Sequence, residues 1–267
     1  MPRVSTRRSA RVALLWHDRE VAHRLRTVTT PLPSEIAIHD GLAYSLWLPR
    51  TGAARGGVLI LHGAGSCKES HHDFARLALA SGLAAISFDQ RGHGDSAGAM
   101  DARALADIAS IAARLRARIG DPSAPLALRG SSMGAYLAIL AAPVVDARAV
   151  VAICPPSAEH LRRGLAADAL RFDANVPALD GFLSSHDLGE AVQALSAPLL
   201  LLHAESDEQV PVQHSRDLAQ QMHSPGSRLI AVPGGHHRSV QHDPELQAIS
   251  VRFIERALEA RAAGPLG

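Results

Sequence analysis

The sequence is short of several residue types, and each shortage narrows what the protein can be. Its 267 residues include only two cysteines, Cys67 and Cys154. Two are too few for a disulfide framework, so we expect a reducing compartment and a cytoplasmic protein. No run of apolar residues approaches the roughly 20 needed for a membrane span. The formal net charge is only +1, which gives no field that would favour nucleic acid or an anionic membrane surface.

Aromatic residues are also scarce, at 3%, although 47% of the chain is hydrophobic and 20% is charged. Such a composition is typical of one large globular domain. We expect this domain to span residues 34–262, with a basic, Arg-rich extension at 1–33 and a short tail at 263–267. The apolar stretch at 12–16 is too short for the core of a signal peptide, which needs about 7–15 residues.

From residue 35 onward, apparent strands alternate with apparent helices. Two short strands around Asp40-Gly41 predict a β-hairpin. Later strands are continuous apolar runs, as in strands buried on both faces. The predicted strands are 35–39, 42–48, 57–62, 83–88, 125–128, 149–154, 198–203 and 228–232. The predicted helices are 74–81, 102–119, 133–142, 212–222 and 244–262. This alternation predicts an α/β fold with a mostly parallel, doubly wound sheet, whose ligand site lies at the carboxyl ends of the strands.

Residues 155–190 interrupt the alternation after the sixth predicted strand. They predict one or two short amphipathic helices and no clear strand, so we interpret them as a small cap inserted above the site. Their large apolar residues are Leu161, Leu165, Leu170, Phe172, Leu179, Phe182 and Leu183. We expect some of these side chains to contact the substrate and others to hold the cap on the sheet.

The sequence Gly130-x-Ser132-x-Gly134 follows an apolar strand and precedes a helix of small and apolar residues. This context is that of a nucleophile elbow, in which a tight turn lifts a serine hydroxyl above the sheet. Glycines on either side leave room where the strand and the helix crowd together. A second G-x-S-x-G surrounds Ser96, but it follows a polar, glycine-rich loop. We therefore predict Ser132 as the nucleophile, whereas Ser131 is off-centre in the motif.

Other polar groups follow predicted strands at the same edge of the sheet. His62-Gly63-Ala64-Gly65 closes one strand, Asp207 follows another, and His237 follows the last. A serine needs a base to take its proton, and an imidazole needs a carboxylate to hold its tautomer. The alternatives left open are Glu205 and Glu208 for the acid, and His236 for the base.

Jointly, these segments resemble the α/β-hydrolase superfamily, near its monoacylglycerol lipase and lysophospholipase-like esterase branch. The resemblance also rests on Phe88-Asp89-Gln90-Arg91-Gly92-His93-Gly94 and on the Gly234-Gly235-His236-His237 turn. It implies the α/β-hydrolase fold, with Ser132 as nucleophile, Asp207 as orienting acid and His237 as base. It further implies an oxyanion hole formed by the backbone N–H groups of Ala64 and Met133. The chain departs from the family at Ser131, where His or Gln is common.

We therefore expect a serine hydrolase that cleaves small or medium-chain carboxylic esters through an acyl-enzyme intermediate. Its partner is a small-molecule ester, and neither an organic cofactor nor a metal is required. A thioesterase, an amide hydrolase or another acyl-transfer enzyme would use the same residues. A binding protein without activity is the alternative from a different class. The sequence leaves the oligomeric state open.

Several other groups have a structural interpretation. The chain has 15 histidines, but the adjacent pair His71-His72 does not face one metal centre, and no H-E-x-x-H spacing occurs. We expect Asp89 and Arg91 to form a buried pair beneath the site. We expect Arg162-Arg163 to be a solvated helix face rather than an anion site.

Overall fold

The computed structural model describes residues 30–50 and 53–260. Of the predicted extension at 1–33, only residues 30–33 lie within these ranges, and the predicted tail at 263–267 lies outside them. The described residues from Leu32 onward group into one compact unit. No helix of the described residues is both long and apolar enough to cross a membrane.

Within these ranges, eight strands form one sheet in the order β1-β2-β4-β3-β5-β6-β7-β8. The hairpin β1–β2 and the neighbouring pair β2–β4 are antiparallel, whereas all the remaining pairs are parallel. The strands are β1 (Glu35–His39), β2 (Leu42–Trp47), β3 (Gly57–Leu61), β4 (Ala84–Phe88), β5 (Leu126–Ser131), β6 (Ala147–Ile153), β7 (Leu199–Ala204) and β8 (Arg228–Val232). This arrangement confirms the predicted fold class.

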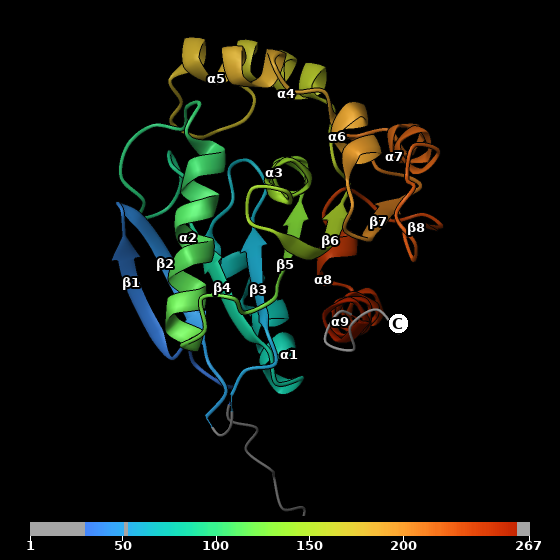
Figure 1. Cartoon of the computed structure of the whole chain (residues 1–267). Helices are drawn as coiled ribbons and strands as arrows, with labels where there is room; N and C mark the ends of the chain where they lie inside the picture. The colour runs from blue at the N-terminus through green and yellow to red at the C-terminus, as the bar shows by residue number, and fades with distance from the viewer. Residues whose placement is uncertain (1–29, 51–52, 261–267) are drawn as a thin grey trace, which may run out of the picture. The chain divides into compact units, whose positions relative to one another are not determined.

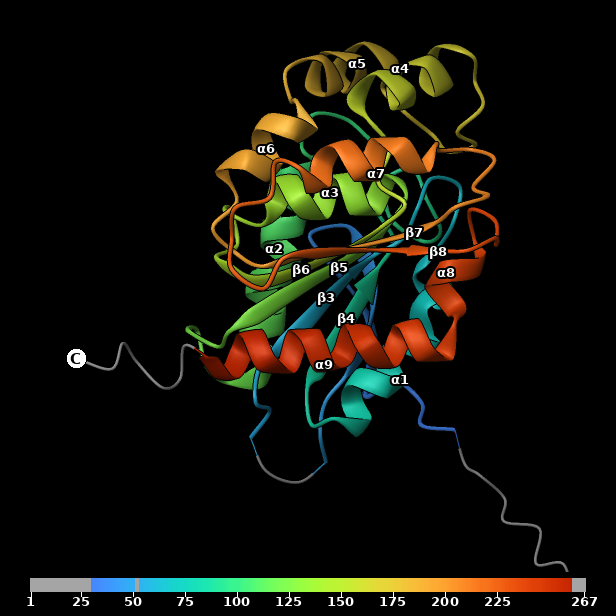
Figure 2. The same cartoon turned by 90° about the vertical axis from the view of Figure 1, so that its right-hand side faces the viewer.

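Helices cover both faces of the sheet (Figures 1 and 2). One face carries α2 (Ala104–Ile119), α3 (Met133–Ala141) and α7 (Val212–Ala219). The other carries α1 (His72–Ala80), the short α8 (Ser239–His242) and α9 (Pro244–Ala260). Because the strands are buried on both faces, their sequences are continuous apolar runs and do not alternate between apolar and polar residues.

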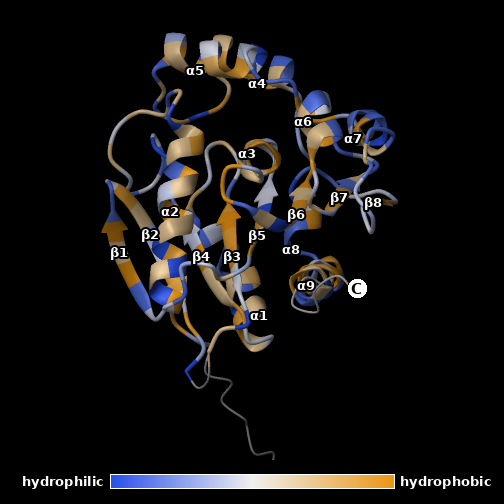
Figure 3. Ribbon diagram, viewed as in Figure 1, coloured by the Kyte–Doolittle hydropathy of each residue, from blue (hydrophilic) through white to orange (hydrophobic). Residues whose placement is uncertain are grey.

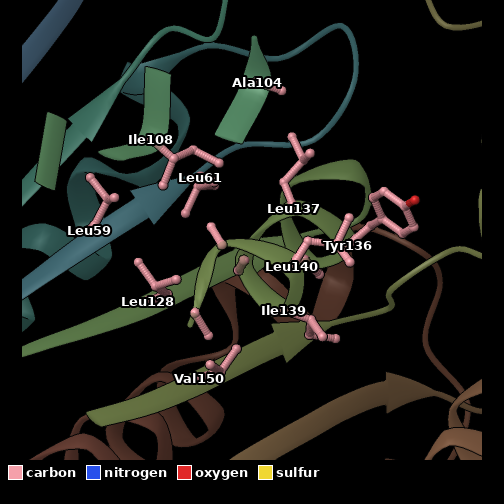
Figure 4. Packing of buried hydrophobic residues seen from close by; sticks show 14 of the residues in the cluster. Leu59, Leu61, Ala104, Ile108, Leu128, Tyr136, Leu137, Ile139, Leu140 and Val150 are labelled. Carbon is pink, nitrogen blue, oxygen red and sulfur yellow. The ribbon is translucent and has the colours of Figure 1, made fainter. Parts of the chain in front are cut away.

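Two apolar clusters, one on each face of the sheet, form the core. Figure 4 shows part of the first cluster, in which Leu59 and Leu128 of the sheet pack near Ile108 and Leu137 of the covering helices. Every residue of α3 is buried, because this helix lies between the sheet and further helices. The hydropathy colouring follows this pattern, since α3 is mostly hydrophobic and α7 largely hydrophilic (Figure 3).

Residues 157–190 contain more helix than the sequence pattern predicts. They form α4 (Ala158–Ala166), α5 (Val176–Ser184) and the start of α6 (Leu188–Ala194). In both views, α4 and α5 lie side by side beyond α3, on the side away from the sheet (Figures 1 and 2). Each helix begins at a side-chain cap, in which Ser157, Asn175 or Asp187 accepts a backbone N–H three residues later. These caps satisfy otherwise free donors of the first turn and explain why such short helices form.

Candidate active site

Ser132 occupies the tight turn between β5 and α3. Its backbone has φ 52° and ψ −125°, a left-handed conformation that costs free energy for a residue with a side chain. The surrounding structure holds it there, and the Ser132 N–H donates to the Ile153 carbonyl at 2.8 Å. β5 extends to Ser131, beyond the predicted end at residue 128, so the strand leads directly into the turn.

The two motif glycines are required by close packing. A Cβ on Gly130 would lie 2.1 Å from the Gly134 carbonyl oxygen, and a Cβ on Gly134 would lie 2.4 Å from the Leu61 carbonyl oxygen. Both obstacles are backbone atoms, which cannot move aside as a flexible side chain can. The motif therefore lets α3 cross close to β3 and β5 at the elbow.

Asp207 and His237 meet although they are 30 residues apart. His237 Nδ1 lies 2.7 Å from Asp207 Oδ2, and both side chains are almost fully buried. The alternatives do not make this contact: Glu205 pairs with Arg216 at 2.8 Å, and Glu208 accepts the His237 backbone N–H and the Gln209 side-chain amide rather than a proton from the His237 ring. His236 is exposed, and its Nδ1 accepts the backbone N–H of Arg238.

The environment of Asp207 favours its charged form. Burial would raise the pKa of this carboxyl, but hydrogen bonds from His203, His237 and the backbone N–H groups of Val210 and Gln209 hold it well below its usual range. The carboxylate can therefore orient the His237 ring and stabilise its cationic form. His203 is the residue here that sequence reasoning missed, and its position in a buried strand carried no signal for this contact.

The His62–Gly65 segment reaches over Ser132. A Cβ on Gly63 would lie 3.1 Å from the Ser132 Cβ, so only glycine allows this approach without displacement. His62 holds the segment in place: its Nε2 accepts the Gln90 N–H at 3.1 Å, which leaves Nδ1–H to donate to the Gly63 carbonyl. Burial lowers the pKa of His62 to about 4, so the ring stays neutral and keeps both roles.

These segments surround a pocket of about 670 Å³. Ser132, His237 and Ala64 all line it, while Asp207 lies behind His237. Met133 begins α3, where the first N–H groups of a helix lack helical partners, and its side chain is buried in the core. The structure thus places Ser132 and His237 in the lining of one pocket and Asp207 in contact with His237.

Only some of the large apolar residues of 155–190 line this pocket. Leu161 and Leu170 line it, whereas Leu179, Phe182 and Leu183 are buried in the core. Phe172 is absent from the lining and stacks on the His93 ring with centroids 4.4 Å apart.

Ser96, the serine of the second G-x-S-x-G, and the charged residues Asp89 and Arg91 have structural roles. Ser96 accepts the Ala43 N–H at 2.9 Å and donates to the Asp89 carbonyl, and it does not line the pocket. The expected pair of Asp89 with Arg91 is wrong. Asp89 instead pairs with Lys68 at 2.8 Å, and Arg91 pairs with Asp107 on α2, because each charge meets a partner brought in by another element.

Among the described residues, one group has the composition of a metal site: Cys154, Asp207 and His237, whose ligand atoms lie within 4.8 Å of one another. The donor set fits a metal poorly. Burial raises the pKa of the Cys154 thiol, whereas a metal binds the thiolate. Asp207 and His237 would also have to give up their mutual hydrogen bond.

The comparisons with known proteins agree with this fold. A model of the alpha/beta hydrolase family matches residues 58–185. A monoacylglycerol lipase of Mycolicibacterium smegmatis is 28% identical over 254 residues, covering 78% of this chain and 89% of the lipase. The lysophosphatidylserine lipase ABHD12 of Danio rerio is also 28% identical, over 74% of this chain, which spans only 57% of that protein's length.

Among solved structures, Est1E from Butyrivibrio proteoclasticus with ferulic acid bound aligns with a TM-score of 0.65. It is 20% identical and covers 86% of this chain and 100% of its own, a likeness that concerns the fold. Together with the mostly parallel eight-stranded sheet and the elbow after β5, these matches show an α/β-hydrolase fold, and the sequence relatives support a likeness to its esterase and lipase branch.

Proposed function

We propose that this chain hydrolyses carboxylic esters through an acyl-enzyme formed on Ser132. The observation that carries the proposal is the hydrogen bond between His237 Nδ1 and Asp207 Oδ2, made beside the pocket that Ser132 and His237 share. Because Nδ1 faces the carboxylate, Nε2 is the nitrogen left to act on a substrate. The monoacylglycerol lipase relative supports the same class of reaction.

In the proposed first step, His237 Nε2 takes the Ser132 hydroxyl proton while Oγ attacks the ester carbonyl carbon. The carbonyl oxygen becomes an oxyanion, which the N–H groups of Ala64 and Met133 stabilise as preorganised donors. The tetrahedral intermediate then expels the alcohol, which leaves with the proton that His237 returns. Water then attacks the carbonyl carbon of the acyl-enzyme, with His237 again as the base, and the carboxylic acid is released from Ser132. Asp207 stabilises the imidazolium in both steps and stays ionised.

The proposed substrates are small or medium-chain acyl esters. The apolar side chains lining the pocket are few, chiefly Leu161, Leu170 and Val210, so the wall that can contact an acyl chain is short. Each buried methylene contributes about 0.8 kcal/mol, and kcat/KM should rise with chain length until this wall is covered. This dependence is measured as kcat/KM for a series of 4-nitrophenyl esters of increasing acyl length, with the wild type and with Leu170→Ala. An optimum that is the same in both proteins would exclude Leu170 as a chain-length determinant.

A fluorophosphonate probe tests the nucleophile and separates an enzyme from a binding protein. The probe should label wild type and Ser96→Ala, and the label should map by mass spectrometry to the peptide that contains Ser132. Ser132→Ala should not react. An unlabelled wild type, or labelling that survives Ser132→Ala, would contradict the proposal. Parallel assays with an oxygen ester, a thioester and an amide of the same acyl group identify the preferred bond.

A further inference from the structure

Two arginines line the pocket without an acidic neighbour in its wall. Arg171 and Arg238 belong to the lining, which contains no aspartate or glutamate. Among the described residues, neither forms an ion pair with a carboxylate. The two arginines of α4 differ, since Arg162 pairs with Asp180 at 2.7 Å and Arg163 with Glu159 at 3.3 Å.

The backbone around Arg171 is held against the oxyanion segment. Arg171 has φ 56°, a conformation that persists in a residue with a side chain only where neighbours enforce it. A Cβ on Gly65 would lie 3.2 Å from the Leu170 carbonyl oxygen and 3.5 Å from the Arg171 Cβ. Arg171 therefore sits directly on Gly65, one residue from Ala64.

Contacts on the following residues fix this position. Phe172 stacks on His93, and His93 Nε2 in turn accepts the Gly65 N–H at 3.1 Å. The Asp173 N–H donates to the Gly92 carbonyl, and the Asp173 carbonyl accepts the Met100 N–H. Arg171 is thus presented by an anchored backbone, although its own side chain is exposed.

Two acids near Arg171 in the chain, Asp168 and Asp173, line a separate pocket of about 200 Å³ that Arg171 also borders. Within the described ranges, neither acid forms an ion pair with the Arg171 guanidinium. Their carboxylates therefore leave the guanidinium available to a group in the larger pocket.

Arg238 approaches from the opposite part of the chain. It follows His237 directly, and the short α8 begins at the next residue. Its exposed side chain lines the same pocket as Ser132. The two arginines therefore belong to opposite parts of the site, Arg171 beside the oxyanion segment and Arg238 beside the base.

We propose that this pocket selects esters that carry a carboxylate or phosphate group, which Arg171 and Arg238 bind while the ester carbonyl lies at Ser132. This inference rests on the proposed hydrolase function. Guanidinium groups recognise both anions through paired N–H donors. The anion replaces the missing carboxylate partners, and the nearby ester carbonyl is thereby directed to the nucleophile.

The experiment compares matched ester pairs that differ in one anionic group. Mono(4-nitrophenyl) glutarate against 4-nitrophenyl pentanoate places a carboxylate on the acyl side. 1-Butyrylglycerol 3-phosphate against 1-butyrylglycerol places a phosphate on the alcohol side. The ratio of kcat/KM, anionic over neutral, is measured for wild type, Arg171→Gln, Arg238→Gln and the double variant. Arg163→Gln loses the same charge outside the pocket lining and serves as the control.

In at least one pair, the wild type should favour the anionic ester. Each pocket variant should lower the ratio about threefold to tenfold, mainly through KM, as expected for a charge-assisted hydrogen bond partly exposed to water. Arg163→Gln should leave the ratio unchanged, and rising salt should reduce it in the wild type. The pair that responds shows which anion is bound.

Two results would overturn the inference while the hydrolase proposal stands. One is hydrolysis of the neutral esters with no anionic preference in either pair. The other is an equal fall of the ratio in Arg163→Gln and in the pocket variants. Failure of the wild type to hydrolyse any of the four esters would instead remove the proposed function, and this inference with it.

Discussion

His203 Nε2 lies 3.3 Å from Asp207 Oδ2, so the Asp207 carboxylate faces two histidines rather than one. The same His203 nitrogen lies 2.9 Å from the Val210 carbonyl oxygen. A carbonyl oxygen can only accept, so Nε2 carries a proton, and this proton also faces the carboxylate. In the neutral ring, Nδ1 then accepts the Ser215 hydroxyl proton. His203 thus connects β7 with the loop that carries Asp207.

The first prediction concerns this second histidine. His203→Leu should lower kcat/KM about tenfold, because losing one hydrogen bond to a charged group costs roughly 1.5 kcal/mol. Ser215→Ala, which removes only the outer contact of His203, should have a smaller effect. Steady-state kinetics on folded protein measures both. Equal effects of the two substitutions would mean that the contact with Asp207 has no role of its own.

The second prediction compares alanine substitutions of the adjacent histidines His236 and His237. His237→Ala should reduce kcat by about 10⁴-fold, because the nucleophile, the base and the acid act as a unit. His236→Ala should keep most of the activity, since His236 is exposed and does not contact Asp207. Measuring kcat for both variants assigns the base. If His236→Ala lost as much activity as His237→Ala, the proposed assignment would be contradicted.

The two G-x-S-x-G segments predict opposite phenotypes. Ser132→Ala should abolish ester hydrolysis while keeping the melting temperature close to that of the wild type. Ser96→Ala should remain active but lose stability, by about 1–2 kcal/mol, because it frees a part-buried backbone N–H and carbonyl. Kinetics and urea denaturation separate the two effects. An inactive but stable Ser96→Ala protein would mean that the nucleophile elbow is not at Ser132.

Two glycines test the packing of the elbow. Gly134→Ala should destabilise the fold by roughly 2–4 kcal/mol, because the new methyl group would overlap backbone oxygens that cannot move. A Cβ added to Gly181 on α5 would meet no described atom within 4 Å. Gly181→Ala should therefore be neutral or stabilising by up to about 1 kcal/mol through helix propensity. Chemical denaturation measures both free energies of unfolding, and equal stability of the two variants would contradict this account.

Acid should weaken the fold through buried neutral histidines. Burial lowers the pKa of His62 to about 4 from 6.5 in the unfolded chain, and it lowers the pKa of His71 as well. Below pH 6.5 the unfolded state binds protons that the folded state does not. The free energy of unfolding should therefore fall between pH 6.5 and 4, by about 3 kcal/mol for His62. In denaturation curves across this range, His62→Gln should show a shallower slope, and a slope like that of the wild type would refute the assignment to His62.

Local patterns make much of the fold predictable. The elbow can be located because a strand, G-x-S-x-G and a helix are contiguous in the sequence, and the continuous apolar runs reflect burial on both faces. The extra helices at 158–194 are harder to predict, because their short length leaves little periodicity and their caps are single residues. The apolar run predicts too early an end for β5, since Arg129 interrupts it although this arginine is buried in the core.

Contacts between distant segments are not predictable in this way. Asp89 and Arg91 are two residues apart and suggest a pair, yet each has its partner on another element. The stacking of Phe172 on His93 joins the cap region to a loop 79 residues earlier, and nothing in the local sequence of either residue indicates it. Similarly, the lack of carboxylate partners for Arg171 and Arg238 becomes visible only when the whole pocket is assembled.

The burial of Lys68 has a practical consequence. Lys68 is the only lysine of the chain, and it is 2% exposed. Burial alone would lower the pKa of its amine, but hydrogen bonds with Asp89, Asp95 and Glu69 raise it. An ammonium held in this way does not react with an activated ester. Amine-directed dyes and resins should therefore leave Lys68 unmodified as long as the protein is folded.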